Sequence, residues 1–366
     1  MRAPGALPTV WVLLGLGAGG NAQMRSLAEA LGWPFETKKL VYNSRNRLPN
    51  IVLGASLLSV DREHSDALEP PWPDLVIAAS RRSVSVARWI QKQSGGSTRL
   101  VHLLHAQAPL HWFDLVITTP QYRLPERPNV LHNLAPLNHV PEQRLTEGAE
   151  KWAPKLAHLP RPRTALLVGG NSSSYELDAA NAARLGREAS AYVRSQAGSL
   201  LVTTSPRTPA AAVDALWSAI DCPAYKYRWQ ANDADNPYFG FLGVADGFIV
   251  TVDSASLLVE ACATGKPVAV FEWPRKGSSA AAGNGGSRHS WLYDGAVYWG
   301  LFKPPRDFDR YHRELRERGF SRRLGEPVRE QPSGSFDDLV RAVARIRDLM
   351  GRDGEESTRA SRGAAA

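Results

Sequence analysis

The chain has 366 residues, of which 43% are hydrophobic and 22% charged, and its formal net charge at pH 7 is +8. This composition is typical of a soluble globular protein, and no apolar run approaches the ~20 residues that a membrane-spanning helix needs. Cys222 and Cys262 are too few for a disulfide framework and lack metal-ligand spacing. We therefore expect a cytoplasmic protein without a metal site or cofactor, whose positive charge suits anionic ligands or an anionic membrane surface.

Short apolar segments alternate with helical patterns in the first half of the chain. The segments are almost continuously hydrophobic, as expected of parallel strands that are covered by helices on both faces. This alternation predicts an open, doubly wound α/β sheet. The predicted strands are residues 9–14, 74–79, 100–104 and 115–118, and the predicted helices are residues 22–31 and 84–91.

The alternation restarts after a proline-rich stretch, residues 134–162, which contains a charged helix over 142–153. The whole sequence therefore predicts two Rossmann-like domains with a ligand-binding cleft between them. In the second half we expect strands at 164–168, 200–203, 225–229, 247–252 and 267–271, with helices from 175 to about 196 and at 254–264. The expected organisation is an N-terminal domain (1–135), a linker (136–162), a C-terminal domain (163–330), a helix (331–350) that packs back on the first domain, and a disordered tail (351–366).

A glycine-rich loop follows the first predicted strand. It contains Gly17, Gly19, Gly20 and Asn21 and leads into a predicted helix, so the segment forms a strand–turn–helix unit rather than a signal peptide. The helix N-terminus favours an anion beside the glycines, while a tight turn without a ligand is the alternative. No acidic residue ends the next strand, as an NAD site would require.

A second such loop opens the second half of the chain. Two glycines and several hydroxyl groups precede the helix expected from Tyr175. One serine suffices to cap a helix, so the additional hydroxyls favour a phosphate at the helix N-terminus, with simple capping as the alternative. The residues concerned are Gly169, Gly170, Asn171, Ser172, Ser173 and Ser174.

The segment after the apolar strand 247–252 is the most informative. Ser254 and Ser256 lie where a helix begins, and Glu260 lies one turn later among apolar residues. A carboxylate in so apolar a helix is costly unless it has a partner. The serines suit a phosphate and Glu260 suits a ribose diol, whereas a structural ion pair with an arginine is the alternative.

Two further segments complete the predicted ligand site. Arg207 lies between Pro206 and Pro209, after a strand and before a helix, where its guanidinium suits a diphosphate. A solvated loop arginine is the alternative. The segment Asn236-Pro237-Tyr238, with Trp229 upstream, is placed to flank a nucleotide base by stacking, and ordinary core packing of these aromatic residues is the alternative.

Several segments together resemble the mitochondrial-fission "elongated mitochondria" family, in particular its bacterial branch. The resemblance covers most of residues 9–275, and its last two segments are the most specific. The segments are GAGGNAQ, LAEALG, PDLVIAASRR, FDLVITT, LLVGGNSSSY, TTSPRTP and NPYFGFLGVADGFIVTVDSASLLVEACATGKPV.

This resemblance implies a fold like that of GT-B glycosyltransferases. The block from Asp253 to Glu260 is similar to the donor site of nucleotide-sugar transferases and of sugar-nucleotide 2-epimerases. It implies that Ser254 and Ser256 meet the diphosphate and that Glu260 meets the ribose. Residues 169–174 match the phosphate loop of that fold, and residues 17–21 match its acceptor-side loop.

One departure concerns catalysis. Lipid-intermediate transferases of this fold place a histidine after the first glycine loop, where this chain has Asn21, which cannot take a proton. The remaining candidates for a base in the first domain are His102, His105, His111 and Asp114. The catalytic residues stay unassigned, and both retaining and inverting chemistry stay open.

The function we expect is a glycosyltransferase that binds a nucleotide-diphosphate sugar and transfers the sugar to an acceptor, which scattered basic segments suggest to be lipid-linked on an anionic membrane. Its base, sugar and acceptor are open. Two alternatives remain, both implied by the resemblance. One is a non-catalytic adaptor that recruits a dynamin-like GTPase, and the other is a nucleotide-sugar 2-epimerase-like enzyme. Nucleic acid is not an expected partner, because the basic residues form no recognisable module.

Overall fold

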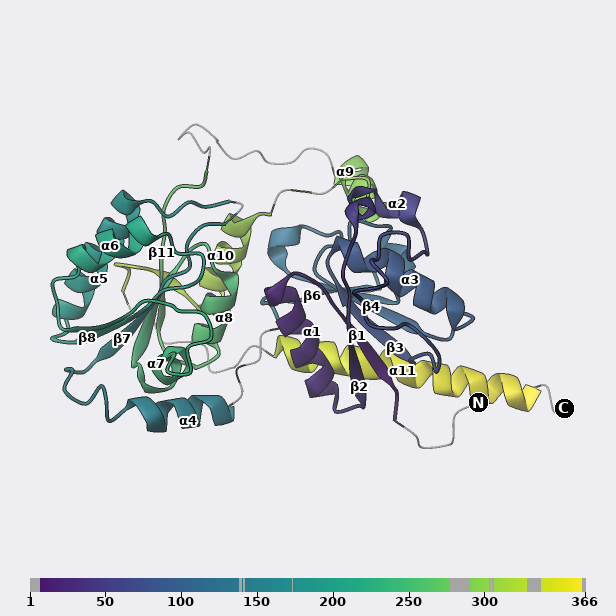
Figure 1. Ribbon diagram of the computed structural model, residues 1–366, viewed down its shortest axis with the longest axis horizontal. Coiled ribbons are helices and arrows are strands. Elements are labelled where there is room, and N and C mark those ends of the chain that lie inside the picture. Colours follow the sequence, from purple (N-terminus) through teal and green to yellow (C-terminus); the bar gives the residue numbers. More distant parts are fainter. Residues whose placement is uncertain are drawn as a thin grey trace. The chain divides into compact units, whose positions relative to one another are not determined.

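The computed structural model of the chain describes residues 7–137, 140, 142–172, 174–276, 290–302, 304, 306–327 and 337–363. It divides into two compact units (Figure 1). Unit 1 comprises residues 1–137, 287–311 and 337–366, and unit 2 comprises residues 138–286 and 312–336. Within the described ranges, no helix has both the length and the apolar character needed to cross a membrane.

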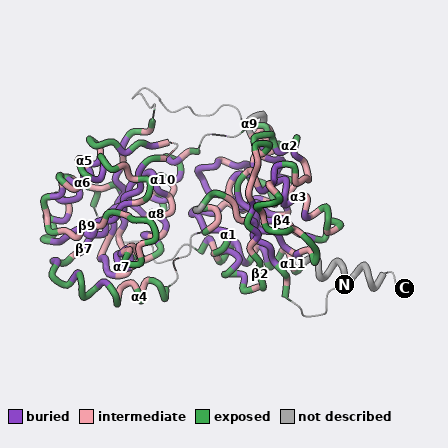
Figure 2. Tube along the Cα trace, viewed as in Figure 1, coloured by how far each residue is buried: buried purple, intermediate pink, exposed green. Residues whose placement is uncertain are grey.

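Unit 1 is built on a six-stranded, all-parallel sheet with the order β2-β1-β3-β4-β5-β6. Alternate side chains of β1, β3, β4 and β5 enter separate apolar cores on the two faces, as Val76 and Ile77 of β3 do. Figure 2 shows this burial along the strands. The strands are β1 (Val10–Leu14), β2 (Phe35–Lys39), β3 (Leu75–Ala79), β4 (Arg99–Leu103), β5 (Leu115–Thr118) and β6 (Val130–His132). The helices are α1 (Ala18–Leu31), α2 (Asn50–Leu53), α3 (Val84–Gln93), α9 (Ser290–Tyr298) and α11 (Asp338–Gly363).

Unit 2 repeats this plan with a six-stranded parallel sheet in the order β12-β11-β10-β7-β8-β9. The α/β fold class with two doubly wound, Rossmann-like units is thereby confirmed. The strands are β7 (Arg163–Leu167), β8 (Ser199–Thr203), β9 (Ala224–Tyr227), β10 (Gly247–Thr251), β11 (Val268–Phe271) and β12 (Arg322–Arg323). The helices are α4 (Glu142–Trp152), α5 (Ala179–Arg194), α6 (Ala210–Ala219), α7 (Tyr238–Val244) and α8 (Ala255–Cys262), and α10 (Phe308–Glu317) contains the point where the chain passes from one unit to the other.

The helix expected within the linker, α4, packs inside unit 2 against α7. Glycines allow this close approach, because a Cβ at Gly148 of α4 would lie 2.7 Å from the Gly240 amide nitrogen of α7. A Cβ at Gly240 would in turn lie 2.4 Å from the Trp152 ring. The proline-rich stretch after α4 therefore runs along unit 2 and leads directly into β7.

The C-terminal helix α11 packs on the unit 1 face that also carries α1. Ala342, Val343 and Ile346 join that core, and the buried Asp338 carboxylate accepts hydrogen bonds from the amides of Leu134 and Ala135 at 3.1 and 2.8 Å. The helix continues to Gly363, past the expected end at residue 350. Residues 351–363 contain no proline to stop it and several good helix formers.

Substitution of the fully buried Ile346 by alanine should lower the stability of unit 1. The lost methyl groups and the resulting cavity should cost about 2–4 kcal/mol. Urea denaturation followed by circular dichroism measures the change. Val340→Ala on the same helix is the control, because Val340 is 70% exposed. Equal effects of the two substitutions would contradict the observed docking of α11.

Candidate functional site

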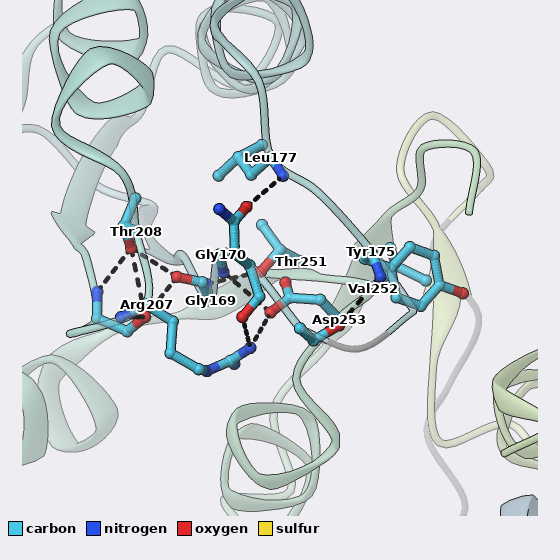
Figure 3. Close-up of polar contacts among 12 residues, drawn as sticks. Gly169, Gly170, Tyr175, Leu177, Arg207, Thr208, Thr251, Val252 and Asp253 are labelled. Atoms are coloured by element: carbon cyan, nitrogen blue, oxygen red, sulfur yellow. Dashed lines mark hydrogen bonds and ion pairs between the residues drawn. The ribbon is translucent and has the colours of Figure 1, made fainter. Parts of the chain in front are cut away.

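The unit 2 sheet changes its direction of winding at β7. The chain leaves β7 toward β8 and β9 and later returns to β10 on the other side of β7. The loops that follow β7 and β10 therefore diverge, and open parallel sheets bind ligands at the carboxyl ends of the strands at such a point. Three loops of unit 2 meet there, after β7, β8 and β10 (Figure 3).

The Asp253 side chain, fully buried, lies at the centre of these loops. Its Oδ2 accepts a hydrogen bond from the Gly170 amide at 2.9 Å, while the Gly169 amide donates to Thr251 Oγ1 at 2.8 Å. A Cβ at Gly169 would lie 2.3 Å from the Asp253 carboxylate, and one at Gly170 would lie 2.2 Å from the carbonyl oxygen of Arg207. The two glycines are thus needed to pack the loop around the chain's own carboxylate.

Arg207 connects the loop after β8 to the same carboxylate. Its Nη1 lies 2.8 Å from Asp253 Oδ2 and donates to the Asn171 carbonyl at 3.1 Å, and the Asn171 amide donates to the Arg207 carbonyl at 2.9 Å. The Arg207 side chain is 39% exposed while that of Asp253 is not exposed at all. The guanidinium therefore joins a buried anion to the surface of the site.

Two hydroxyl groups of the loop after β8 fix the loop after β7. Thr208 Oγ1 donates to the Gly169 carbonyl at 2.5 Å, and Ser205 Oγ donates to the same oxygen. The Ser205 amide donates in turn to Thr208 Oγ1 at 3.0 Å. Side chains of the TTSPRTP segment thus hold the glycine pair in place.

The environment of Asp253 acts on its protonation in opposing directions. Burial raises the pKa of Asp253 above its ordinary value, and the Arg207 charge and the hydrogen bonds from Thr251 and Gly170 lower it by a smaller amount. The net effect is a raised pKa. Keeping the buried carboxylate ionised therefore costs free energy, and the positive charge of Arg207 reduces that cost.

The loop of residues 169–174 differs from the expected phosphate loop in its connection to the helix. The helix begins at Ala179 rather than Tyr175, and Asp178 caps it by accepting from the Asn181 amide at 2.7 Å. The Asn171 side chain accepts from the Leu177 amide, and Ser172 Oγ accepts from the Tyr175 amide. The expectation of a helix N-terminus directly behind this loop is therefore wrong, because these polar side chains stabilise an extended turn; Ser173 lies outside the described residues.

Helix α8 does begin directly behind its strand, as the sequence predicted. Ser254 is its N-cap, with no hydrogen bond from its side chain to the helix, and Ser256 lies in the first turn. The Leu258 amide, which donates to the Ser254 carbonyl, is the first in α8 to bond the carbonyl four residues earlier. The amides of residues 255–257 thus form the bare N-terminus of the helix, which attracts anions.

Glu260 is bonded by a tyrosine, whereas the structural alternative drawn from the sequence was an arginine. The Tyr238 hydroxyl, at the start of α7, donates to Glu260 Oε2. Burial and the nearby Glu260 charge raise the pKa of Tyr238 well above its ordinary value, so the phenol is neutral. Asn236, two residues earlier, accepts a hydrogen bond from the Tyr238 amide and so orients the start of α7.

The glycine loop of unit 1 occupies the corresponding point in the other sheet, between β1 and β3. Helix α1 begins at Ala18, earlier than expected, so that Gly19, Gly20 and Asn21 lie in its first turn. Gly17 is the N-cap, without a side-chain hydrogen bond. The Asn21 side chain bonds both the amide and the carbonyl of Gly15, at 3.1 and 2.7 Å, which closes the turn.

The four candidates for a base in unit 1 have different surroundings. Asp114 accepts from Arg99 and from the Leu100 amide, which makes it a structural residue. His102 is fully buried and donates to the Ser80 carbonyl, and burial lowers its pKa to about 4, so it is neutral at pH 7. His105 accepts from the Gln107 amide, and His111 is exposed beside Trp299.

The structure thus brings Gly169, Gly170, Asn171, Arg207 and Ser254 together around Asp253. One contributor, Asp253 itself, was not among the predicted site residues, although an aspartate directly after a fully apolar strand was an available signal for it. Tyr238 was expected beside a nucleotide base, whereas its hydroxyl bonds Glu260. No sequence signal indicated that bond, because it joins two helices that are apart in the sequence.

Comparison with known sequences identifies relatives. A family model described as Mitochondrial fission ELM1 matches residues 18–284. The chain is 28% identical over 241 residues to the mitochondrial fission protein ELM1 of Arabidopsis thaliana, a match that covers 60% of this chain and 56% of the plant protein. It is 25% identical over 296 residues to the uncharacterized protein RP120 of Rickettsia prowazekii, covering 72% of this chain and 83% of that one.

Solved structures show more distant likenesses. The catalytic domain of starch synthase IV from Arabidopsis thaliana, bound to ADP and acarbose, is 10% identical with a TM-score of 0.48, over 95% of this chain and 99% of that one. The UDP-GlcNAc 2-epimerase of Methanocaldococcus jannaschii, in complex with UDP-GlcNAc and UDP, is 12% identical with a TM-score of 0.46, over 93% and 99% of the two chains. At TM-scores below 0.5, these likenesses assign no role to any residue here.

Arg207→Gln should destabilise the protein in a pH-dependent way. A buried carboxyl with a raised pKa contributes stability that is fully present below its unfolded pKa and is lost as pH rises through its folded pKa. Without Arg207 the folded pKa of Asp253 rises further, so the loss relative to the native chain should be small near about pH 4 and reach about 1–2 kcal/mol near about pH 7, allowing for the partial exposure of Arg207.

Urea denaturation across this pH range measures the effect. The same substitution in an Asp253→Asn background is the control and should give a loss that does not change with pH. A loss in the single variant that is equal at all pH values would show that Arg207 acts by packing and not through the charge of Asp253.

Proposed function

We propose that this chain, which belongs to the Mitochondrial fission ELM1 family, binds a nucleoside-diphosphate sugar at the carboxyl edge of the unit 2 sheet and transfers the sugar to an acceptor. The observation that carries the proposal is the start of α8. Ser254 and Ser256 and the bare amides of residues 255–257 lie at the point where the sheet changes direction. That combination suits a diphosphate.

Different residues around α8 would bind different parts of such a ligand. Arg207 is close to the surface and carries a permanent positive charge, which suits the diphosphate and the negative charge that develops on it when the sugar leaves. Glu260 lies one turn into α8, where its carboxylate suits the ribose hydroxyl groups. The hydrogen bond from Tyr238 holds that carboxylate in position.

The glycine pair 169–170 has a supporting role in this proposal. Its amides donate to Thr251 and Asp253, so they orient the chain's own groups and do not face a phosphate. Asp253 then fixes Arg207, which would meet the ligand. The donor site is therefore proposed to consist of Arg207, Ser254, Ser256 and Glu260, with Asn236 and Tyr238 as positioning residues.

A second function, an adaptor in organelle or membrane fission, is favoured by the family itself and by the name of the Arabidopsis relative. The chain spans 56% of the length of that relative. An adaptor needs a protein-binding surface and does not depend on Glu260. Ligand binding through Glu260 therefore separates the two functions.

A thermal-shift titration against UDP-, GDP-, CMP- and dTDP-sugars tests the proposal. Ligand at ~100 times its Kd should add roughly 2.7 kcal/mol to the free energy of unfolding. Glu260→Gln keeps an oxygen that can accept from Tyr238 but removes the charge, and it should abolish most of this stabilisation. Glu150→Gln, at an exposed position of α4, is the matched control and should leave it unchanged.

The outcomes differ for the two functions. Stabilisation by one nucleotide family that is lost only in Glu260→Gln supports the donor site, and product analysis with lipid-linked and soluble acceptors follows. If no nucleotide sugar stabilises the folded protein, the transferase proposal fails and the adaptor function becomes the better candidate.

A further inference from the structure

Unit 1 exposes large apolar side chains on two segments that flank one loop. On α2 and just before it, Leu48, Ile51 and Val52 are 42%, 55% and 64% exposed. At and after the end of α9, Trp299, Leu301 and Phe302 are 51%, 71% and 43% exposed. Both α2 and α9 lie at the upper end of unit 1 in Figure 1. We call these six residues the apolar patch.

Both segments contact the loop of residues 106–108. The buried Asn50 side chain donates to the carbonyls of Ala106 and Gln107, both at 3.1 Å. On the other side, a Cβ at Gly300 would lie 2.5 Å from the backbone of Ala108. The two halves of the apolar patch are therefore neighbours across this loop, although they are far apart in the sequence.

The fold requires the inward residues of these segments and not the outward ones. Asn50 and Leu53 are buried and stand three residues apart, so Ile51 and Val52 between them point outward. In the same way Val297 is fully buried, and Trp299 follows it on the outside. Ile51, Val52 and Leu301 expose more than half of their surface, so packing within unit 1 does not account for their apolar character.

The charges around the apolar patch are predominantly positive. Arg45 and Arg47 are exposed, and Arg81 donates to the Leu48 carbonyl at 2.9 Å, which places a third guanidinium beside the patch. Residues 41–60 contain no acidic residue. On the α9 side, Arg127 lies over the Tyr298 ring at 5.5 Å, and the acidic residues are Asp294 and the exposed Glu126.

From this arrangement we propose that the apolar patch of unit 1 docks onto an anionic membrane surface. Exposed aliphatic and tryptophan side chains insert at the level of the lipid headgroups, and the surrounding arginines meet anionic lipids. The occupant is a lipid surface rather than a protein because Arg45, Arg47 and Arg81 lie beside the α2 half of the apolar patch, where residues 41–60 contain no acid. The proposal goes beyond sugar transfer and does not depend on it.

Sedimentation of the full chain with phosphatidylcholine vesicles, with and without phosphatidylglycerol, tests the proposal. We expect binding to the anionic vesicles that weakens with added salt. The double variant Trp299→Ser, Leu301→Ser should bind at least about tenfold more weakly. Arg45→Gln with Arg47→Gln should cause a similar loss on anionic vesicles. Val340→Ser is the matched control, because Val340 is equally exposed, on α11 of the same unit.

Several outcomes would overturn the proposal. The first is the absence of binding to anionic vesicles, and the second is equal binding by the double variant and by Val340→Ser. The third is that the native chain and Val340→Ser are dimers in solution while the double variant is a monomer, which would make the apolar patch an interface between copies. Thermal stabilisation of the same variants by nucleotide sugar is measured in parallel. It reports on unit 2, so loss of membrane binding and loss of donor binding are distinguishable.

Discussion

The carboxylate of Asp253 is buried where the unit 2 sheet changes direction, and three loops depend on it. The Gly170 amide and the Arg207 guanidinium both bond it, and Gly169 must lack a side chain to make room for it. A buried charge of this kind is tolerable only with such partners. The glycine-rich loop therefore already holds an anion, one that belongs to the chain. Any phosphate must bind beside this arrangement, and the start of α8 is the neighbouring position with bare amides.

Much of the fold was predictable from the sequence because parallel strands that are buried on both faces consist of short, continuous runs of apolar residues. Leu75–Ala79 and Leu115–Thr118 are examples, and both are wholly buried. Strand β12 consists of Arg322 and Arg323 and carries no apolar signal, since it lies at the sheet edge and its arginines bond Glu326, Tyr192 and Glu272. The single turn of α2 is too short for a helical period to be read from it.

The candidate site was predictable in position but only partly in detail. Loops at the carboxyl ends of parallel strands can be located once the strands are known, and Arg207 and Ser254 do lie in loops that follow β8 and β10. Which side chains meet there depends on tertiary packing. The sequence could not pair Tyr238 with Glu260, nor show that Asp178 rather than a serine caps α5. Helix starts are set by such single hydrogen bonds, and local propensity does not determine them.

The two units show opposite departures from what folding alone requires. In unit 2 the charge of Asp253 is fully buried, and in unit 1 several large apolar side chains are more than half exposed. Ile51 and Trp299 stand at outward positions whose inward neighbours, Asn50 and Val297, already fix the local structure. In the two proposals, the first departure fixes Arg207 beside a diphosphate, and the second faces a lipid surface. If the acceptor of the sugar is lipid-linked, both would serve one reaction, since a membrane-bound chain meets such an acceptor by diffusion in two dimensions and not in three.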